Sequence, residues 1–249
     1  MQLSVIIDSR RAGSWLGQVL TGYALQTWRD FEVIVLSGAD SPAAGLVAER
    51  RRGFPVALRH VAAGGAPAAE ALDVAIAQAG GEYLLFTRSA CLPRPDLVAA
   101  HAGLAERGRF LSGSSCRLGP DLSRRIVRND IVLGRCFEPG WLQARGRLDA
   151  ARRRQLALRP EPRSLVEALV PSAVRFDPRN ASAWKRDLIH GRGDPAGRLR
   201  ARGVRGRGAR NRALCLQLSN IARDGAPAAA APVVGATGHG EAQGWRRYG

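Results

Sequence analysis

The fold is decided by residues 3–36, which read LSVIIDSRRAGSWLGQVLTGYALQTWRDFEVIVL. The apolar run at residues 3–7 is bounded by polar residues, as expected of a buried parallel strand. Apolar residues between Trp15 and Ala24 then recur at helical spacing, and residues 31–36 form a second apolar run. This strand, helix and strand predict the start of a parallel sheet.

The same alternation continues to about residue 107. The pattern predicts helices at residues 43–52, 67–79 and 95–107, and extended segments at 56–61 and 83–87. Strands that alternate with helices indicate a parallel sheet covered on both faces. Further on the pattern weakens, with helix candidates at 121–133 and 164–170 and a late strand at 213–218. We therefore expect an α/β fold, a mostly parallel sheet flanked by helices, with an irregular basic C-terminal part.

The chain length of 249 residues fits a single core followed by a tail. We expect one domain over residues 1–222 and a disordered tail, rich in Ala, Gly and Pro, over residues 223–249. No apolar run approaches the roughly 18 residues that a membrane span needs, and the N-terminus lacks a basic leader. These features predict a cytoplasmic protein without a transmembrane segment.

The formal charge of +17 lies in the second part of the chain. Residues 1–100 contain nine arginines and nine acids, whereas the remainder carries 29 basic and 12 acidic residues. Arginine is densest from Arg192 to Arg212, and such a stretch could contact a polyanion or the anionic inner face of a membrane. Aromatic residues for base stacking are absent from it, which makes nucleic-acid binding the weaker alternative.

The four cysteines give no metal or disulfide pattern. They are Cys91, Cys116, Cys136 and Cys215, with no CxxC pair and no histidine at ligand spacing. Neither a zinc site nor a disulfide framework is predicted, and we expect small, mostly buried side chains.

A series of short blocks accompanies the strand and helix pattern. They are LSVII (3–7), LQTW (25–28), DFEVIV (30–35), GEYLLF (81–86), CLPRPD (91–96), FLSG (110–113), the stretch 180–188 with Trp184, and GVR (203–205) leading to LCLQL (214–218). In this order and spacing the chain resembles the family 2 glycosyltransferases, which have the GT-A fold. The resemblance holds from residue 3 to about 116 and recurs in pieces to about 220. No single block is diagnostic.

The resemblance implies a ligand, a cofactor and an acceptor. Members of the family bind a nucleotide-diphosphate sugar and transfer the sugar to a saccharide or other acceptor. Carboxylates after the second strand hold the nucleoside, and an Asp-x-Asp pair anchors a divalent cation that neutralises the leaving diphosphate. A further Asp or Glu removes the proton of the acceptor hydroxyl.

The chain departs from the family pattern at each of these chemical positions. Ser37-Gly38 stands where paired acids are usual, and Thr87-Arg88-Ser89 follows the strand that should lead to Asp-x-Asp. The segment of the base is shortened to 191–199 and keeps only Asp194, and a late histidine is replaced in 217–220. We expect no metal site, because its ligands are missing.

The candidate binding residues lie at predicted strand ends, where ligands of open α/β sheets bind. They are Asp8, Arg10, Ser37, Asp40, Arg88 and Ser89. Arg88 stands in place of a metal ligand, and its guanidinium could pair with a diphosphate in a bidentate way. A solvated loop is the alternative for each residue. Asp194 is a weak candidate for the base, because the Gly-Asp-Pro sequence around it favours a turn.

Two functions stay open at this point. The first is a glycosyltransferase with an altered, metal-free site, and the second is a non-catalytic relative that keeps the fold for binding or as a partner of an active transferase. We favour the second slightly, because the charge of the leaving group would depend on Arg88 alone. The sugar-transfer interpretation is built on one premise, that Ser37 and Arg88 lie together at the mouth of one crevice. If the two side chains lie on opposite faces of the sheet, or if there is no parallel sheet, the sugar-transfer interpretation fails.

Overall fold

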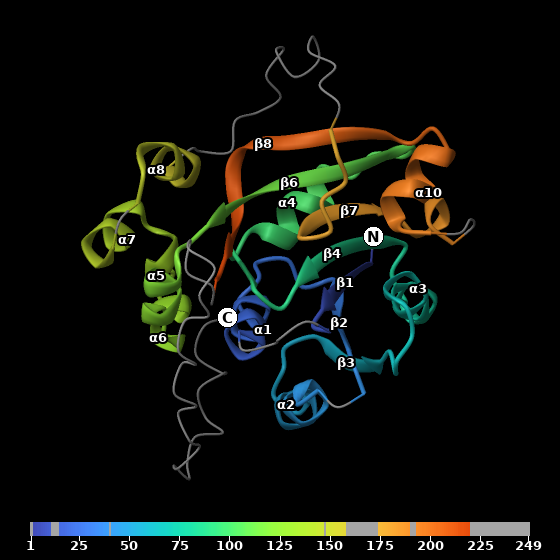
Figure 1. The fold of residues 1–249 in the computed structure, drawn as a ribbon, viewed down its shortest axis with the longest axis horizontal. Coiled ribbons are helices and arrows are strands. Elements are labelled where there is room, and N and C mark those ends of the chain that lie inside the picture. The colour runs from blue at the N-terminus through green and yellow to red at the C-terminus, as the bar shows by residue number, and fades with distance from the viewer. Residues whose placement is uncertain are drawn as a thin grey trace.

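The computed structural model describes residues 2–10, 15–39, 41–146, 148–157, 174–189 and 193–219, with the side chains at 68, 154–155 and 208–214 left undescribed. Its described part is built around an eight-stranded sheet with strand order β3-β2-β1-β4-β7-β6-β8-β5 (Figure 1). The helix candidate at 164–170 and the expected tail at 223–249 lie outside the described residues.

The first half of the sheet is parallel, as predicted. Its strands are β1 (Leu3–Asp8), β2 (Phe31–Ser37), β3 (Ala57–Ala62) and β4 (Tyr83–Arg88), connected by α1 (Leu16–Ala24), α2 (Ala43–Arg51) and α3 (Ala68–Gln78). β1 pairs in parallel with both β2 and β4, and β2 pairs in parallel with β3. All four strands therefore end at one edge of the sheet, which we call the carboxyl edge. Their starts form the amino edge.

The second half of the sheet is mixed. β7 (Asn180–Trp184) is antiparallel to β4 and to β6 (Arg109–Arg117). β8 (Arg205–Gln217) is parallel to β6, and the short β5 (Cys91–Pro93) is antiparallel to β8. β6 and β8 thus run in the same direction as β1 and β4. The whole is an α/β fold with a mixed, mostly parallel sheet.

Two expectations for the later part of the chain need correction. The late strand begins at residue 205 rather than 213, because the alternating arginines and glycines pair with β6 and continue the ladder. The predicted helix at 121–133 is two helices, α5 (Pro120–Arg125) and α6 (Arg128–Val132), since Ile126 and Val127 are extended between them. The remaining helices are α4 (Leu97–Gly103), α7 (Pro139–Arg145), α8 (Ala150–Ala157) and α10 (Pro195–Ala201), with 3-10 turns η1 (Arg135–Phe137) and η2 (Lys185–Asp187).

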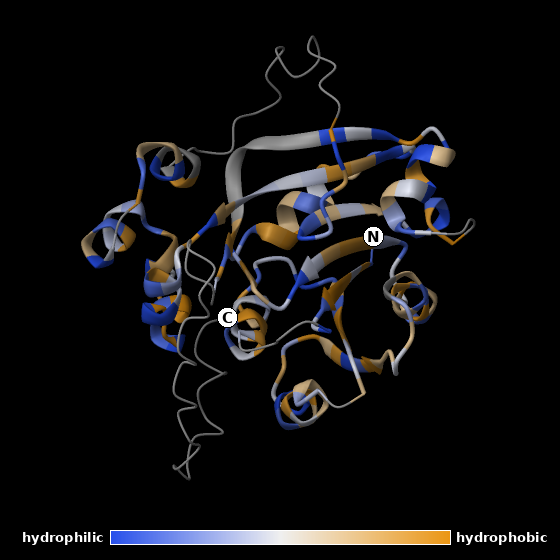
Figure 2. Cartoon of the chain, in the orientation of Figure 1, coloured by the Kyte–Doolittle hydropathy of each residue, from blue (hydrophilic) through white to orange (hydrophobic). Residues whose placement is uncertain are grey.

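Both faces of the parallel strands are buried, which explains their continuous apolar sequence. On one face Val5, Val33 and Leu85 pack with residues of α1, α2 and α4. On the other face Ile6, Ile34 and Phe86 pack with residues of α3 and α10. Hydropathy is accordingly high along the central strands (Figure 2). A third cluster lies under α5 to α8, and it contains Cys116 and Cys136.

The cysteines agree with the sequence expectation. All four are buried, and none is in a disulfide. Within the described residues, no helix combines the length and the apolar character that a membrane span requires.

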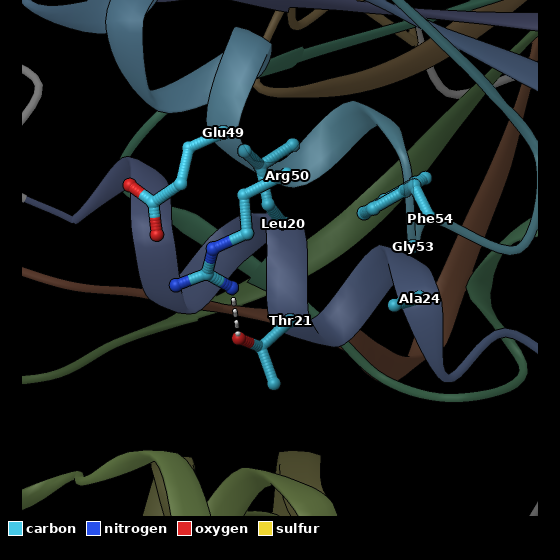
Figure 3. A pocket seen from close by; sticks show the side chains of 7 residues that line it. All are labelled: Leu20, Thr21, Ala24, Glu49, Arg50, Gly53 and Phe54. Carbon is cyan, nitrogen blue, oxygen red and sulfur yellow. Dashed lines mark hydrogen bonds between the residues drawn. The ribbon is translucent and has the colours of Figure 1, made fainter. Parts of the chain in front are cut away.

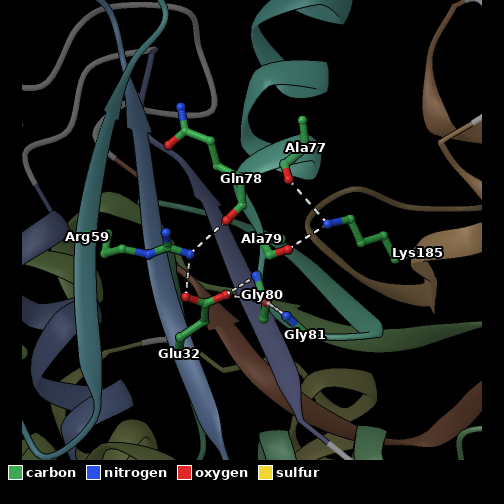
Figure 4. A network of polar contacts seen from close by, with 9 residues as sticks. Glu32, Arg59, Ala77, Gln78, Ala79, Gly80, Gly81 and Lys185 are labelled. Carbon is green, nitrogen blue, oxygen red and sulfur yellow. Dashed lines mark hydrogen bonds and ion pairs between the residues drawn. The ribbon is translucent and has the colours of Figure 1, made fainter.

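A buried carboxylate ties the amino edge together (Figure 4). Glu32 of β2 accepts hydrogen bonds from the Ser4 hydroxyl (2.6 Å) and from the backbone N–H of Gly80 (2.6 Å), and it forms an ion pair with Arg59. Burial raises the pKa of Glu32, but these hydrogen bonds and the charge of Arg59 outweigh it and lower the pKa overall. Close by, the Lys185 ammonium donates to the carbonyl oxygen of Ala79 at 2.6 Å.

Candidate functional site

The carboxyl edge begins with two residues of opposite charge on neighbouring strands. Asp8 ends β1 and Arg88 ends β4, and the two are directly paired in the parallel ladder. Since paired residues of a sheet point to the same face, their side chains leave the sheet together. The Asp8 carboxylate is held by Arg10, whose Nε and Nη2 donate to its two oxygens at 2.9 and 2.8 Å.

The Asp8 carboxylate is stabilised in its charged form. Burial raises the pKa of Asp8, but the hydrogen bonds from the Arg10 side chain and backbone and the charges of Arg10 and Arg88 outweigh it, so the pKa is lowered overall. Asp8 is therefore an anion at neutral pH. Arg88 contributes to this field without forming an ion pair with any residue that the structure describes, and it is exposed at the strand end.

A second carboxylate with its own arginine meets the same edge from β7. Because Asn180 pairs with Thr87, the residues just before β7 lie beside the end of β4. There the Arg179 Nε donates to both oxygens of Asp177 at 2.9 and 3.1 Å, and the Arg179 Nη1 donates to the Gln217 side-chain oxygen at 3.3 Å. Burial raises the pKa of Asp177, but Arg179 and the charge of Arg88 outweigh it and lower the pKa overall.

Together these five side chains form what we call the arginine cluster: Arg10, Arg88 and Arg179 with Asp8 and Asp177. The two carboxylates each fix one arginine in place, and the third arginine has no ion-pair partner among the described residues. The cluster carries an excess of positive charge on a sheet edge where ligands of α/β folds bind. Fixed guanidinium groups are suited to phosphate oxygens.

Asp8, Arg10 and Arg88 of the cluster were candidates from the sequence, whereas Asp177 and Arg179 were not. These two residues precede a strand, and only residues that follow strands were expected at this edge. The signal that could have found them is the antiparallel direction of β7, which brings its first residues to the carboxyl edge.

The premise about Ser37 and Arg88 is wrong. Arg88 shares a face with Asp8 and Leu36, and Ser37 as the next residue along β2 points to the opposite face. Ser37 is fully buried, with its hydroxyl 2.8 Å from Nε2 of His60. By the criterion set from the sequence, the sugar-transfer interpretation in that form fails, and Ser37 is removed from the site. The criterion was too strict for the fold, because the strand order does not depend on that side chain.

Two other candidates are placed differently from Asp8 and Arg88. The Ser89 side chain is only 3% exposed, and its backbone N–H donates to the carbonyl oxygen of Asp8 at 3.2 Å. Ser89 therefore supports the end of β1 through its backbone. Asp40 lies outside the described residues.

Asp194 caps a helix. Its carboxylate accepts a hydrogen bond from the backbone N–H of Gly197 at 2.7 Å, and Pro195 occupies the first turn of α10. This is the geometry of an N-cap residue, as the turn interpretation suggested. The segment around Asp194 connects the end of β7 with the start of β8, and both lie at the amino edge. No described contact links Asp194 with the arginine cluster.

The residues at the end of β4, where the resemblance implies an Asp-x-Asp pair, do not fit a divalent cation. Thr87 is 3% exposed, and Arg88 brings a positive charge to the place where the cation would lie. Asp8 and Asp177 are already paired with arginines. Among the described residues, no group of three His, Cys, Asp or Glu side chains is placed to hold a metal ion. The donor set matches an anion instead.

The stretch from Arg192 to Arg212 is not a uniform basic surface where it is described. Arg198 is 5% exposed, forms an ion pair with Asp73 and donates to the carbonyl oxygen of Leu188. Arg207 forms an ion pair with Glu106 at 3.6 Å. Part of its charge therefore stabilises the packing of α10 and β8.

A surface pocket of about 250 Å³ lies elsewhere, between α1 and the end of α2 (Figure 3). Leu20, Thr21 and Arg50 line it, and the Arg50 Nη1 donates to the Thr21 hydroxyl at 3.5 Å. The C-terminal ends of α1 and α2 lead to the starts of β2 and β3, so this pocket belongs to the amino edge. It contains none of the arginine cluster.

Comparisons with known proteins identify the fold. No family model matches the chain, and no curated protein matches it. Among solved structures, residues 1–349 of TarS from S. aureus match with a TM-score of 0.53 and 14% identity, over 88% of this chain and 60% of that chain. TarS was also solved in complex with UDP-GlcNAc, with a TM-score of 0.52.

A second similar structure is the mannosyltransferase PcManGT from Pyrobaculum calidifontis, in complex with GDP-Man and Mn²⁺. It matches with a TM-score of 0.54 and 17% identity, over 86% of this chain and 56% of that chain. This chain thus spans less than two thirds of either protein. The chain has a GT-A-like fold. Its relation to the nucleotide-sugar glycosyltransferases is one of structure, at low sequence identity.

Proposed function

We propose that this chain is a glycosyltransferase relative that binds a nucleotide diphosphate, free or as a nucleotide sugar, without a metal ion. The observation that carries the proposal is Arg88, an exposed guanidinium without a described ion-pair partner at the end of β4. It takes the place where the fold family usually positions a metal ligand. The positive charge of this guanidinium would then take the role of the cation's charge.

The rest of the arginine cluster supports this proposal. Arg10 and Arg179 are held by two hydrogen-bonded carboxylates, so little side-chain freedom is lost when they meet an anion. Arg88 lies between these pairs and lowers the pKa of both Asp8 and Asp177 through its charge. A diphosphate would meet up to three guanidinium groups on one edge of the sheet.

Whether the chain also transfers a sugar is a separate question. The Asp-x-Asp pair is missing, and Asp194 is engaged as a helix cap. We therefore propose binding as the primary function, with the chain acting as a non-catalytic relative or a partner of an active transferase. An enzyme with a metal-free site is the second candidate, and Arg88 as a stand-in for the cation is the feature that favours it.

Binding is tested by titrating UDP, GDP and TDP into the protein in a calorimeter, with and without EDTA. We expect one nucleotide to bind equally well in both conditions and the Arg88→Ala variant to bind at least tenfold more weakly, a loss of about 1.4 kcal/mol. The matched control is Arg51→Ala, which removes an exposed arginine of α2 far from the cluster. Binding that vanishes on chelation, or that Arg88→Ala leaves unchanged, would overturn the proposal.

Catalysis is tested by incubating a panel of nucleotide sugars with the protein, with Mn²⁺ and with chelator. Release of nucleotide well above background in chelator would favour the metal-free enzyme. Binding without turnover would favour the non-catalytic relative. If neither binding nor turnover is observed, the remaining interpretation is an interaction module with the same fold.

A further inference from the structure

A second surface of the chain combines exposed apolar side chains with arginines. It consists of Arg125, Val127, Arg128, Val132 and Leu133, and we call it the α5–α6 surface. Val127 is 56% exposed, Val132 40% and Leu133 57%. The described residues include six exposed large hydrophobic side chains, and three of the six lie between positions 127 and 133. Scattered exposure is ordinary in soluble proteins, but such a local concentration needs an explanation.

The core of the protein does not use these apolar side chains. Ile126 and Ile131 of the same segment are each 1% exposed, and they pack in the third hydrophobic cluster. The inner side of α6 is thus already packed against the core. Val132 and Leu133 are exposed instead, and hydrophilic and hydrophobic residues mix along α5 and α6 (Figure 2). α6 has five residues, or about 8 Å of helix, so Val127, Arg128, Val132 and Leu133, which lie in it or cap it, are close in space. Arg125 ends α5, two residues before Val127.

The charge of this region is positive. Residues 117–135 contain five arginines and two aspartates. Asp121 is paired with Arg124 at 2.6 Å, and Asp130 is buried, where its carboxylate accepts from the backbone N–H of Val127. Arginines close in sequence to exposed valine and leucine side chains match an anionic lipid surface, which offers phosphate groups above an apolar layer.

The α5–α6 surface lies toward the same edge of the sheet as the arginine cluster. β6 runs parallel to β4, so its last residue, Arg117, is at the carboxyl edge. There the backbone N–H of Leu118 donates to the carbonyl oxygen of Gln217, the residue whose side chain accepts from Arg179. α5 begins two residues later. Contact of this surface with a membrane would therefore bring the carboxyl edge near lipid-bound molecules.

We propose that the α5–α6 surface docks the chain on an anionic lipid bilayer. This surface is separate from the arginine-rich stretch between Arg192 and Arg212, part of which is engaged in internal ion pairs. Apolar side chains enter the interface and arginines pair with lipid phosphates. Nucleotide binding at the arginine cluster is not required for it.

The proposal is tested by co-sedimentation of the full chain with vesicles of phosphatidylcholine, with and without 30 mol% (about one lipid in three) phosphatidylglycerol. We expect binding to the anionic vesicles alone. The double variant V127S/L133S keeps every charge and should bind those vesicles at least tenfold more weakly. Its binding to heparin should remain unchanged, because a soluble polyanion meets only the arginines. The matched control Val74→Ser, on an exposed valine of α3, should behave as the parent chain.

The charge requirement is tested with Arg125→Glu, which should weaken binding to anionic vesicles several-fold. Circular dichroism checks that each variant is folded, and nucleotide titration separates this test from that of the arginine cluster. Equal binding of V127S/L133S and the parent chain to vesicles would overturn the proposal. So would no vesicle binding by the parent chain, or self-association that V127S/L133S abolishes, since the surface would then bind a second copy.

Discussion

The two edges of the central sheet contain the same kinds of side chain in different states. At the amino edge the carboxylate of Glu32 is buried, and Ser4, Gly80 and Arg59 all bind it (Figure 4). At the carboxyl edge the carboxylates of Asp8 and Asp177 each take one arginine. There Arg88 is left without an ion pair among the described residues.

This difference separates structural charge from charge that can bind a ligand. A buried ionic group with all its partners contributes to folding and offers nothing to a ligand. An exposed guanidinium between two fixed ion pairs contributes little to stability, yet its donors remain available to an anion. The comparison predicts that substitutions at the amino edge change stability, whereas those at the carboxyl edge change binding.

The largest effect is expected from Glu32→Ala. The substitution leaves the Ser4 hydroxyl and the Gly80 N–H without their buried acceptor, and it removes the partner of Arg59. We expect the free energy of unfolding to fall by about 3 kcal/mol, measured by urea denaturation. Glu82→Ala is the control, because that carboxylate is 72% exposed and pairs loosely with Arg107, and it should cost less than about 0.5 kcal/mol. A similar loss in both variants would break the comparison.

The next effect concerns the support of the carboxyl edge by His101. This side chain is completely buried on α4, and its ring nitrogens lie 2.7 Å from the Ser182 hydroxyl and 2.8 Å from the Asn180 side-chain oxygen. Burial lowers the pKa of His101 to about 4. As the pH falls from 6.5 to 4, the unfolded chain takes up a proton at His101 that the folded chain does not. The free energy of unfolding should therefore fall by about 1.4 kcal/mol for each pH unit in this range.

The measurement is urea denaturation at several pH values. His101→Gln keeps a polar side chain at the site but cannot take up a proton in this range, so its pH dependence between 6.5 and 4 should be flatter than that of the parent chain. Equal slopes for the two proteins would assign the acid sensitivity to other groups, and His101 would not be a buried neutral histidine.

Much of the parallel half of the fold could be predicted from the sequence. Its strands are apolar throughout because both faces are covered, and the apolar residues of its helices recur at helical spacing. Local sequence patterns are therefore enough to predict these elements. The later strands could not be found in the same way. β8 alternates arginine with glycine at its start, and only its pairing with β6, about 95 residues away in sequence, makes it a strand.

The candidate site was predicted in part for the same reason. Asp8 and Arg88 follow apolar strands, and their pairing across the sheet follows from the parallel alternation. The face of each side chain depends on the register, which the sequence alone did not specify, so Ser37 was assigned to the wrong side. Asp177 and Arg179 reach the edge through an antiparallel pairing with β4 that no local pattern indicates.

A smaller effect sharpens the binding side of the comparison. In Arg179→Ala the cluster loses a guanidinium that Asp177 holds in place, while Arg88 and Arg10 remain. We expect the affinity for the preferred nucleotide diphosphate to fall three- to tenfold, or about 1 kcal/mol, measured by calorimetry. Because Arg179 is partly exposed, the urea midpoint should change little. A large loss of stability without a loss of affinity would make Arg179 a structural residue.

The last effect, of similar size, is expected at Asp194, the N-cap of α10 near the amino edge. Asp194→Ala removes the acceptor for the Gly197 N–H at the start of α10, so the free energy of unfolding should fall by about 1 kcal/mol. Asp194→Ser retains a capping oxygen and should recover most of that loss. Neither variant should alter nucleotide binding, and turnover, if any is found, should also be unchanged. Loss of turnover in the well-folded Asp194→Ser would show that the carboxylate acts as a base, and the amino edge would then take part in function as well as in folding.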